Sequence, residues 1–183
     1  MSRVGIYGGT FDPIHLGHLH VITQLFEKDL VDQLIVIPAG QPLLRDFQPR
    51  ATGQQRFTMC ELAVTTLPES MRAKVSVNPI EILRDGPSYA IDTVVAIQAS
   101  FPNDQIFLVI GADAFEKINQ WHRIDDLEKM VQIICINRPG YKGQGIEVNA
   151  LEVSATSIRE GRSSQVPEKV GAFIRENGLY DNQ

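Results

Sequence analysis

Five short runs of apolar, mostly β-branched residues divide the chain and constrain its fold more than any other feature. They lie at residues 4–7, 34–37, 75–77, 106–110 and 133–136, each bounded by Gly, Pro, Asn or Asp. Such runs are typical of buried strands. The intervening stretches show helical periodicity, as in Leu19, Ile22, Leu25 and Phe26, then Phe57, Cys60, Leu62 and Val64, then Ile91, Val94, Val95 and Ile97. This alternation predicts an α/β fold with a doubly wound, mostly parallel sheet.

Helix ends are marked at two further places. Thr52 followed by Gln55 is a capping-box pattern, which predicts a helix starting after Thr52. Pro167 and Gly178 bracket a last helix, with Pro167 expected at its first position and Gly178 just beyond its end. In open parallel sheets ligands bind outside the carboxyl ends of the strands, so the loops that follow the strands are the candidate binding segments.

Composition excludes several classes of protein. The 183 residues suit one domain, residues 1–183, and the net charge of −5 argues against a nucleic-acid-binding surface. Cys60 and Cys135 lie in apolar stretches without CxxC spacing, which is typical of reduced core thiols. There is no signal-peptide pattern and no apolar segment of about 20 residues. We therefore expect a cytoplasmic protein with no membrane segment.

A candidate phosphate site follows the first strand, in the segment Gly8-Gly9-Thr10-Phe11-Asp12-Pro13-Ile14-His15-Leu16-Gly17-His18. Small residues let backbone N–H groups approach an anion, and the positive end of the following helix is directed to the same point. The segment lacks the Gly-Lys-Ser/Thr of a Walker loop and the GxGxxG of a dinucleotide fold. The sequence therefore predicts a phosphate site of another kind, with Gly8, Gly9, Thr10, Phe11 and Gly17 as candidate phosphate-binding residues.

His15 and His18 are spaced to share one face of a helix, with the small Gly17 between them. Both can donate hydrogen bonds to charge that develops on a phosphoryl group. Two alternatives remain at this point. A His pair at this spacing can hold a metal, although a zinc site needs further ligands, or it can be merely structural.

The segment resembles the Gly-x-Phe-Asp-Pro-x-His-x-Gly-His motif of the nucleotidylyltransferase superfamily. The stretch Ser154-Ala155-Thr156-Ser157-Ile158-Arg159 is similar to a second motif of that superfamily, a Ser/Thr-rich helix start with an arginine. Thr156 and Ser157 are expected to cap this helix and donate hydroxyls, and Arg159 offers a planar fork to the β- and γ-phosphates of ATP. The resemblance implies catalytic roles for His15, His18 and Arg159.

Three more stretches resemble the nicotinate-mononucleotide adenylyltransferase family of that superfamily. Residues 86–93, with Ser88, Tyr89 and Ala90, are similar to a segment that opens a helix near the nicotinate carboxylate. Gly111-Ala112-Asp113 resembles a Gly-Ala-Asp of the dinucleotide site, so that Gly111 and Asp113 become acceptor-site residues. Trp121-His122 resembles a pair whose indole lies against the pyridine ring.

The chain departs from the family pattern at two positions. Residues 38–45 resemble Pro-x-x-x-Pro-x-x-Lys, with Arg45 in the place of the lysine, which keeps the positive charge expected to contact a phosphate. Ala90 stands where a threonine is frequent, so that a hydroxyl contact to the acceptor is replaced at most by a backbone contact.

The resemblance implies transfer of AMP from ATP to nicotinate mononucleotide, with release of pyrophosphate, in the biosynthesis of NAD. Mg²⁺ would enter with ATP, held by phosphates and water and not by a protein metal site. ATP and nicotinate mononucleotide are thus the expected partners. A phosphopantetheine adenylyltransferase and a nucleotide-binding sensor without turnover are the alternatives.

Overall fold

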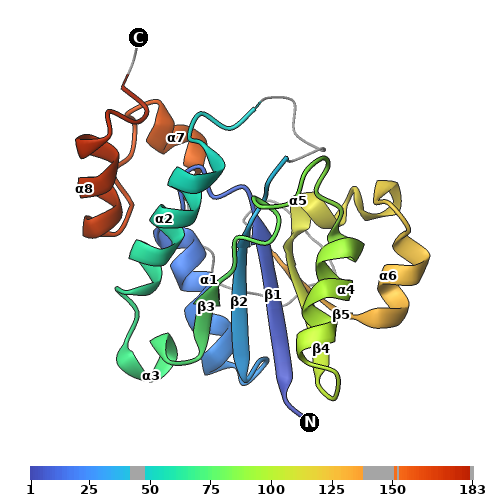
Figure 1. Cartoon of the computed structure of the whole chain (residues 1–183). Coiled ribbons are helices and arrows are strands. Elements are labelled where there is room, and N and C mark those ends of the chain that lie inside the picture. Colours follow the sequence, from blue (N-terminus) through green and yellow to red (C-terminus); the bar gives the residue numbers. More distant parts are fainter. Residues whose placement is uncertain (42–47, 138–150, 152, 182–183) are drawn as a thin grey trace.

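In the computed structural model, which describes residues 1–41, 48–137, 151 and 153–181, five strands form one parallel sheet (Figure 1). The strand order is β3-β2-β1-β4-β5. The strands are β1 (Arg3–Gly9), β2 (Gln33–Pro38), β3 (Val75–Val77), β4 (Gln105–Gly111) and β5 (Gln132–Ile136). Each of the five apolar runs of the sequence is a strand, and every pairing is parallel. The predicted α/β fold is confirmed, with an all-parallel sheet in place of a mostly parallel one.

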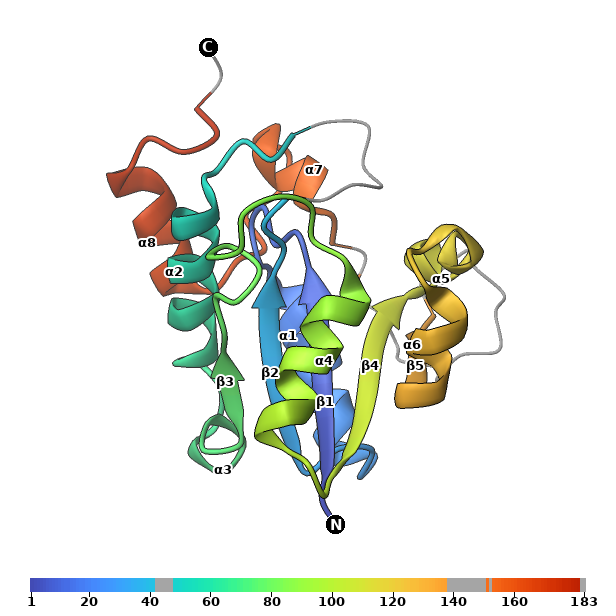
Figure 2. The same cartoon turned by 45° about the vertical axis from the view of Figure 1, so that its right-hand side comes forward.

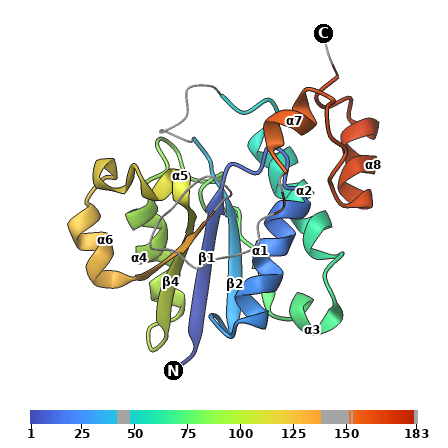
Figure 3. The same ribbon diagram turned by 180° about the vertical axis from the view of Figure 1, so that it is seen from behind.

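Helices cover both faces of the sheet. They are α1 (Leu16–Glu27), α2 (Gly53–Val64), α3 (Glu69–Arg72), α4 (Ala90–Ser100), α5 (Ala112–Phe115), α6 (Ile124–Met130), α7 (Ala155–Arg159) and α8 (Glu168–Glu176), with a 3₁₀ turn η1 (Ile118–Gln120). Figures 1 and 3 show α4 and α6 on one face and α1, α2 and α8 on the other. Figure 2 shows α5 and α7 near the end of the sheet to which the strands point. The loops at the carboxyl ends of the strands therefore meet beside these two short helices.

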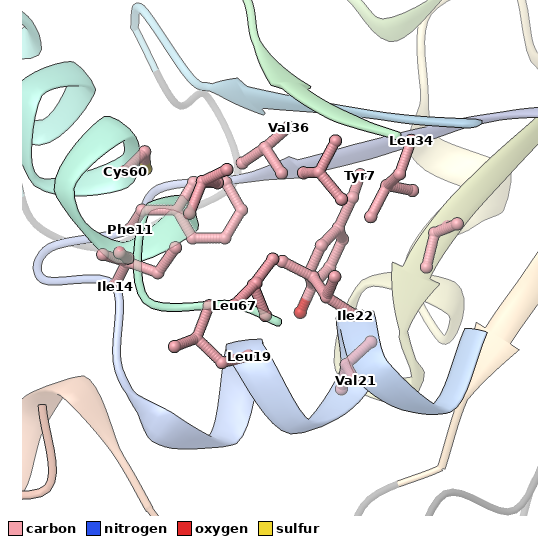
Figure 4. Close-up of a cluster of buried hydrophobic side chains, with 14 of the residues drawn as sticks. Tyr7, Phe11, Ile14, Leu19, Val21, Ile22, Leu34, Val36, Cys60 and Leu67 are labelled. Carbon is pink, nitrogen blue, oxygen red and sulfur yellow. The ribbon is translucent and has the colours of Figure 1, made fainter. Parts of the chain in front are cut away.

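The side chains of each strand alternate between two apolar clusters, because successive residues of a strand point to opposite faces. Ile6 packs toward α4, and its neighbour Tyr7 packs toward α1. Figure 4 shows the second of these environments, where Tyr7 and Phe11 meet Leu19 and Ile22 of α1. Phe11 follows β1, so this cluster reaches from the sheet into the loop that carries the candidate phosphate site.

The predicted helix ends agree closely with the structure. Thr52 caps α2, with its hydroxyl accepting from the Gln55 backbone nitrogen (3.2 Å) and the Gln55 side chain accepting from the Thr52 nitrogen (2.9 Å). Pro167 is the residue before α8 and not its first helical position, and Gly178 lies two residues past its end in a left-handed conformation (φ 58°). No helix of the described residues is long and apolar enough to cross a bilayer.

The predicted apolar faces need two corrections. In α2 the buried positions include Arg56, Met59 and Ala63, whereas Phe57 and Leu62 are only half-buried. In α4, Val95 is exposed and Thr93 is buried. The other predicted positions, Cys60, Val64, Ile91, Val94 and Ile97, are buried as expected. Arg56 and Thr93 are buried beside them because polar side chains that find hydrogen-bond partners can be buried.

Candidate active site

One open cleft of about 1150 Å³ lies at the carboxyl ends of β1 and β4. It brings together every candidate residue from the sequence except Arg45, which is outside the described residues. The cleft is lined by Gly8, Gly9, Thr10, Phe11, His15, Gly17, His18, Ser88, Tyr89, Ala90, Gly111, Asp113, Trp121, Thr156, Ser157 and Arg159. The motifs around residues 8–18 and 154–159 are almost 150 residues apart in sequence, and they meet here because β1 lies at the centre of the sheet.

The turn from β1 into α1 leaves an open space at its first glycine. A Cβ atom added at Gly8 would have no neighbour within 4 Å, so the backbone there is accessible to a ligand. Phe11 adopts a left-handed conformation (φ 50°) and its ring is buried in the core, which fixes the turn from below. The N-terminus of α1 follows at Leu16 and provides N–H groups that a helix cannot pair internally. The turn is therefore suited to bind an anion.

His15 and His18 stack on each other at the start of α1. Their ring centroids are 3.7 Å apart with an angle of 25° between the planes. His15 is the residue before the helix and not part of it, and its backbone nitrogen donates to Nδ1 of His18 (3.1 Å). Because Nδ1 accepts this bond, the neutral His18 ring carries its proton on Nε2. His18 therefore presents Nε2–H as its donor.

Gly17 is required by the stacked histidines. A Cβ atom at this position would lie 3.0 Å from Cε1 and 3.1 Å from Nδ1 of His15. Such contacts are tighter than ordinary van der Waals distances, so the His15 ring would have to move. A glycine at this position allows the His15 ring to pack against the first turn of α1.

Asp12 connects the phosphate turn to the start of α2. Its side chain is 3% exposed and accepts from the backbone nitrogens of Arg50 (2.9 Å) and Ala51 (3.1 Å). The peptide bond from Asp12 to Pro13 is cis. Sequence reasoning did not include Asp12 in the site, although it lies inside the phosphate motif, because its contacts are to backbone groups distant in sequence.

Arg159 projects from α7 into the same cluster and is 7% exposed. One guanidinium nitrogen donates to the carbonyl of Asp12 (2.7 Å) and lies 3.9 Å from the Asp12 carboxylate, and the other donates to the hydroxyl of Thr156 (3.0 Å). The guanidinium is thus held in one orientation by groups of the phosphate turn and of its own helix. Arg159 also lines the cleft, and its contact with a phosphate stays a prediction.

The cap of α7 differs from the prediction. Ser154 precedes the helix and accepts from the Ser157 nitrogen (3.1 Å), whereas Thr156 and Ser157 lie within the helix. The hydroxyls of Ser154 and Ser157 are 2.8 Å apart. A cap must accept from a nitrogen two or three residues later, and only Ser154 precedes the helix by that spacing.

Arg56 was missed by sequence reasoning. It is 2% exposed, and its guanidinium donates to the carbonyls of Thr10 (2.8 Å), Ala51 (3.3 Å) and Gly40 (3.4 Å). Burial lowers the pKa of Arg56, and the nearby Asp12 partly opposes this shift. The available signal was its position, because Arg56 lies three and four residues before the buried Met59 and Cys60.

The other half of the cleft is built around the start of α4. Tyr89 directly precedes the helix, so the backbone N–H groups of its first turn, beginning at Ala90, face this region unpaired by the helix itself. The Tyr89 ring lies against that of His122, with centroids 4.3 Å apart. His122 is a lining residue that the sequence prediction did not assign.

Ser88 and Glu81 join the loops on this side. The Ser88 hydroxyl accepts from the Gln41 nitrogen (3.2 Å), and Glu81 accepts from the Thr93 hydroxyl (2.8 Å). Burial raises the pKa of Glu81, against the opposing effect of hydrogen bonds from Thr93 and Ser88. A Cβ at Gly40 would lie 2.1 Å from the Glu81 carbonyl oxygen, so these loops touch backbone to backbone.

Asp113 and Trp121 complete this half of the cleft. Gly111 ends β4 and precedes α5, where a Cβ would lie 2.6 Å from Oδ1 of Asp113. Trp121 follows η1 and packs against the cluster under α4 and α6. The cleft therefore has a turn at β1 that is suited to an anion, and an aromatic region with a helix start at β4 and α4.

Within the described residues, no three His, Cys, Asp or Glu side chains converge as metal ligands. Residues 138–145, which follow β5, lie outside the described residues together with Arg45. His15 and His18 stack face to face, and no third ligand joins them among the described residues.

Comparison with known proteins agrees with this geometry. The model of the cytidylyltransferase-like family matches residues 6–161. The nicotinate-nucleotide adenylyltransferase of Bacillus subtilis (strain 168) is 34% identical over 194 aligned residues that cover both chains completely. A probable nicotinate-nucleotide adenylyltransferase of Bacillus pumilus (strain SAFR-032) is 36% identical, also over the whole of both chains.

Solved structures show the same fold. The Plasmodium falciparum nicotinic acid mononucleotide adenylyltransferase complexed with NaAD superimposes with a TM-score of 0.85 at 17% identity, covering 100% of this chain and 99% of that one. A putative nicotinate-nucleotide adenylyltransferase from Vibrio parahaemolyticus gives 0.72 at 19% identity, covering 100% and 98%. By its family model and its full-length relatives, the chain belongs to the cytidylyltransferase-like family and, within it, to the nicotinate-nucleotide adenylyltransferases.

Proposed function

We propose that the chain transfers AMP from ATP to nicotinate mononucleotide, giving nicotinate adenine dinucleotide and pyrophosphate in the biosynthesis of NAD. The observation that carries this proposal is the division of one cleft into two different sites. The β1–α1 turn with its stacked histidines suits a polyphosphate, and the start of α4 with Tyr89 and Trp121 suits a flat anionic ring. The names of the full-length relatives support the same acceptor.

The reaction needs no side-chain nucleophile. The 5′-phosphate of the acceptor is an anion near neutral pH, and one of its oxygens attacks the α-phosphorus of ATP. A new P–O bond forms as the bond between the α-phosphorus and the bridging oxygen breaks, and that oxygen leaves with pyrophosphate. The protein contributes by aligning the two phosphates and by stabilising the charge of the transition state.

Each residue of the phosphate half has a role that follows from its placement. His18 donates through Nε2–H and His15 supports it by stacking, which places donors where charge grows on the phosphoryl group. Gly8, Gly9 and Thr10 contact the phosphates through the turn. Arg159, oriented by Asp12, stabilises the leaving pyrophosphate together with Ser157.

Mg²⁺ accompanies ATP in this proposal. The ion would be held by phosphate oxygens and water. The ion neutralises part of the triphosphate charge when bound. The residues of the chain then need only hold the phosphates in line.

We further propose that the acceptor site prefers the acid to the amide. The unpaired N–H groups at the start of α4, from Ala90 onward, favour a carboxylate, whereas an amide would present its own NH₂ donor to them. Hydrogen bonds to a charged group contribute roughly 1.5–3 kcal/mol each, so kcat/KM for the acid should exceed that for the amide by more than about tenfold. Trp121 would contact either ring and should not discriminate.

A pyrophosphate-release assay with ATP tests the function. We expect turnover with nicotinate mononucleotide, weaker turnover with its amide, and none with phosphopantetheine. Equal use of acid and amide would contradict the nicotinate assignment. Turnover with phosphopantetheine alone would establish the rival transferase, and ATP binding without any turnover would indicate a sensor.

Three further assignments belong to this proposal. Arg45 contacts a substrate phosphate, so Arg45→Gln should raise the KM of that substrate, and Arg45→Lys, which keeps the charge, should raise it less.

Residues 1–183 form one domain, since both apolar clusters pack on the same sheet. Cys60 and Cys135 are free and buried, which fits work in the reducing cytoplasm.

A further inference from the structure

The C-terminal segment after α8 reaches back to the active-site cleft. The hydroxyl of Tyr180 donates to Oδ1 of Asp12 at 2.7 Å, across 168 residues of sequence. Figure 1 shows α8 beside α2 at the same edge of the molecule as α7. The Tyr180 ring packs against the cluster that contains Phe11 and Ile14. A residue close to the end of the sequence thus contacts the phosphate turn.

The partner of Tyr180 is the residue on which that turn depends. Asp12 takes three hydrogen bonds in its carboxylate, from Tyr180 and from the backbone nitrogens of Arg50 and Ala51. Its carbonyl accepts from the guanidinium of Arg159 (2.7 Å). A displacement of Asp12 therefore moves the acceptor that orients Arg159 and the turn that precedes His15.

The backbone at Tyr180 shows that this contact is held under constraint. Tyr180 has φ 65°, in the left-handed region that a bulky side chain rarely adopts. Such conformations persist where the surrounding structure determines them, and they cluster at functional sites. Burial raises the pKa of the Tyr180 hydroxyl, and the neighbouring Asp12 adds to this, so the group stays protonated and remains a donor.

We propose that Tyr180 is a positioning residue for the ATP phosphates. By donating to Asp12 it fixes the β1–α1 turn and, through the Asp12 carbonyl, the guanidinium of Arg159. This role depends on the proposed function in one respect, namely that ATP is the polyphosphate that binds here. It makes the C-terminal segment part of the phosphate half of the cleft and not of the acceptor half.

The Tyr180→Phe variant keeps the ring and removes only the hydroxyl. Oδ1 of Asp12 would then retain the Ala51 nitrogen as its donor, and the carboxylate would lose one of three hydrogen bonds. A hydrogen bond to a charged group of this kind corresponds to on the order of a tenfold change in an equilibrium. We expect affinity for an ATP analogue to fall by about that factor, and the KM of the acceptor to stay the same.

Lys169→Met is the matched control. Lys169 of α8 donates to the Thr65 hydroxyl (3.0 Å) and ties the same C-terminal region to the end of α2 without touching Asp12. Both variants lose one hydrogen bond between the C-terminal region and the body of the protein. Only Tyr180→Phe should alter ATP binding.

Calorimetric titration of the full chain with Mg²⁺ and α,β-methylene-ATP measures this directly and needs no acceptor. Weaker binding in Tyr180→Phe alone, with an unchanged acceptor KM, supports the proposal. Wild-type binding in Tyr180→Phe, or an equal loss in Lys169→Met, overturns it. If the wild-type chain binds the analogue and turns over none of the acceptors, the proposed function fails while the Tyr180 comparison can still be read.

A double-mutant cycle tests the route through Asp12. If Tyr180 acts through Asp12, adding Tyr180→Phe to Asp12→Ala, which removes the acceptor of the Tyr180 hydroxyl, should weaken binding no further. A full additional loss in the double variant would show a different route and contradict the proposal. Thermal melts of each variant accompany the titrations. If Asp12→Ala fails to fold, the comparison of Tyr180→Phe with Lys169→Met still tests the proposal.

Discussion

The two ends of the β-sheet carry their charges in opposite ways. At the amino end, Arg3 forms ion pairs with the partly exposed Asp32 (2.7 Å) and the exposed Asp29 (2.8 Å). At the carboxyl end, Arg56 and Arg159 are buried, and their hydrogen bonds go mainly to neutral backbone carbonyls. Arginine thus forms surface ion pairs at one end of the sheet, and at the other end it donates hydrogen bonds that hold a backbone turn in place.

This difference between the two ends shows where the protein buries charged side chains at an energetic cost. Burial lowers the pKa of the Arg56 guanidinium because the charged group loses hydration, whereas at Arg3 the hydrogen bonds to Asp32 and Asp29 outweigh burial and raise the pKa. Among the described residues, the buried charged side chains Asp12, Arg56 and Arg159 lie at this end of the sheet, where they hold the loops that follow the strands. We therefore expect substitutions at the carboxyl end to affect function strongly and those at the amino end to affect stability weakly.

The largest expected effect comes from removing a donor at the carboxyl end. His18→Ala should lower kcat by on the order of 10²-fold or more, because Nε2–H is a preorganised donor to developing charge. Steady-state kinetics with ATP and nicotinate mononucleotide measure this. A folded variant with near wild-type turnover would refute the role.

His20→Ala provides the control for that experiment. His20 lies two residues further along α1 and is not among the residues that line the cleft. It should leave turnover unchanged and affect only thermal stability. A similar kinetic loss in both variants would mean that α1 as a whole, and not the stacked pair, had been disturbed.

The same substitution at both ends sharpens the comparison. Arg56→Met should reduce the free energy of unfolding by roughly 1.5–3 kcal/mol, because the carbonyls of Thr10, Ala51 and Gly40 lose a charged donor. Arg3→Met should cost less, and its effect should shrink in high salt, which screens exposed pairs. Urea denaturation at two salt concentrations measures both, and equal losses would remove the distinction between the two ends.

Gly17→Ala should separate stability from function at the carboxyl end. Alanine favours a helix over glycine by up to about 1 kcal/mol, so the fold should not weaken. The added Cβ would press on the His15 ring, at 3.0 Å from Cε1, and turnover should fall roughly three- to tenfold. Gly171→Ala in α8, whose Cβ would meet neighbours only at 3.4 Å, should gain stability without loss of turnover.

The smallest effect is a difference in pH dependence between two carboxyls. Arg3 lowers the pKa of Asp32 to about 2 from its ordinary 3.8, so the stability it provides is present above pH 3.8 and is lost as pH falls toward 2. Burial raises the pKa of Glu81 above 4.5, so its contribution is present below pH 4.5 and is lost as pH rises. Asp32 should therefore make the free energy of unfolding rise with pH, and Glu81 should make it fall with pH. Asp32→Asn and Glu81→Gln should each remove one of these two opposite pH dependences.

Urea midpoints of the wild type and both variants from pH 2 to 7 measure these slopes. The difference in free energy of unfolding between Asp32→Asn and the wild type should shrink as pH falls. The free energy of unfolding of Glu81→Gln should rise relative to that of the wild type as pH rises. If both variants changed the pH dependence of the unfolding free energy in the same direction, the two carboxyls would not have the opposite pKa shifts described here.

Sequence alone predicts the sheet and both phosphate motifs, because each depends on residues adjacent in the chain. The β-branched runs mark the five strands, and the segment from Gly8 to His18 marks the turn after the first of them. The capping box at Thr52 is equally local, since its two hydrogen bonds span three residues. Local sequence patterns are therefore enough to predict these features.

The rest depends on contacts between distant segments. The Tyr180–Asp12 bond and the three carbonyl partners of Arg56 involve loops whose positions only the folded sheet defines. The α7 cap at Ser154 was misplaced because three hydroxyl residues occur within four positions there, and each could serve as a cap. A polar side chain is buried where it finds hydrogen-bond partners. When those partners are distant in sequence, the residue leaves no periodic pattern in the sequence that would predict its burial.

The central position of β1 has a consequence for biosynthesis. In the register of the sheet Tyr7 pairs with Val36 of β2 on one side and with Val109 of β4 on the other. On the ribosome the first of these neighbours emerges early, whereas the second follows only after much of the chain has been translated. Until then one edge of an apolar strand has no partner, and such an edge can pair with other chains. A translational pause between residues 36 and 109 would therefore lengthen the interval in which the nascent chain is open to aggregation and to chaperone capture.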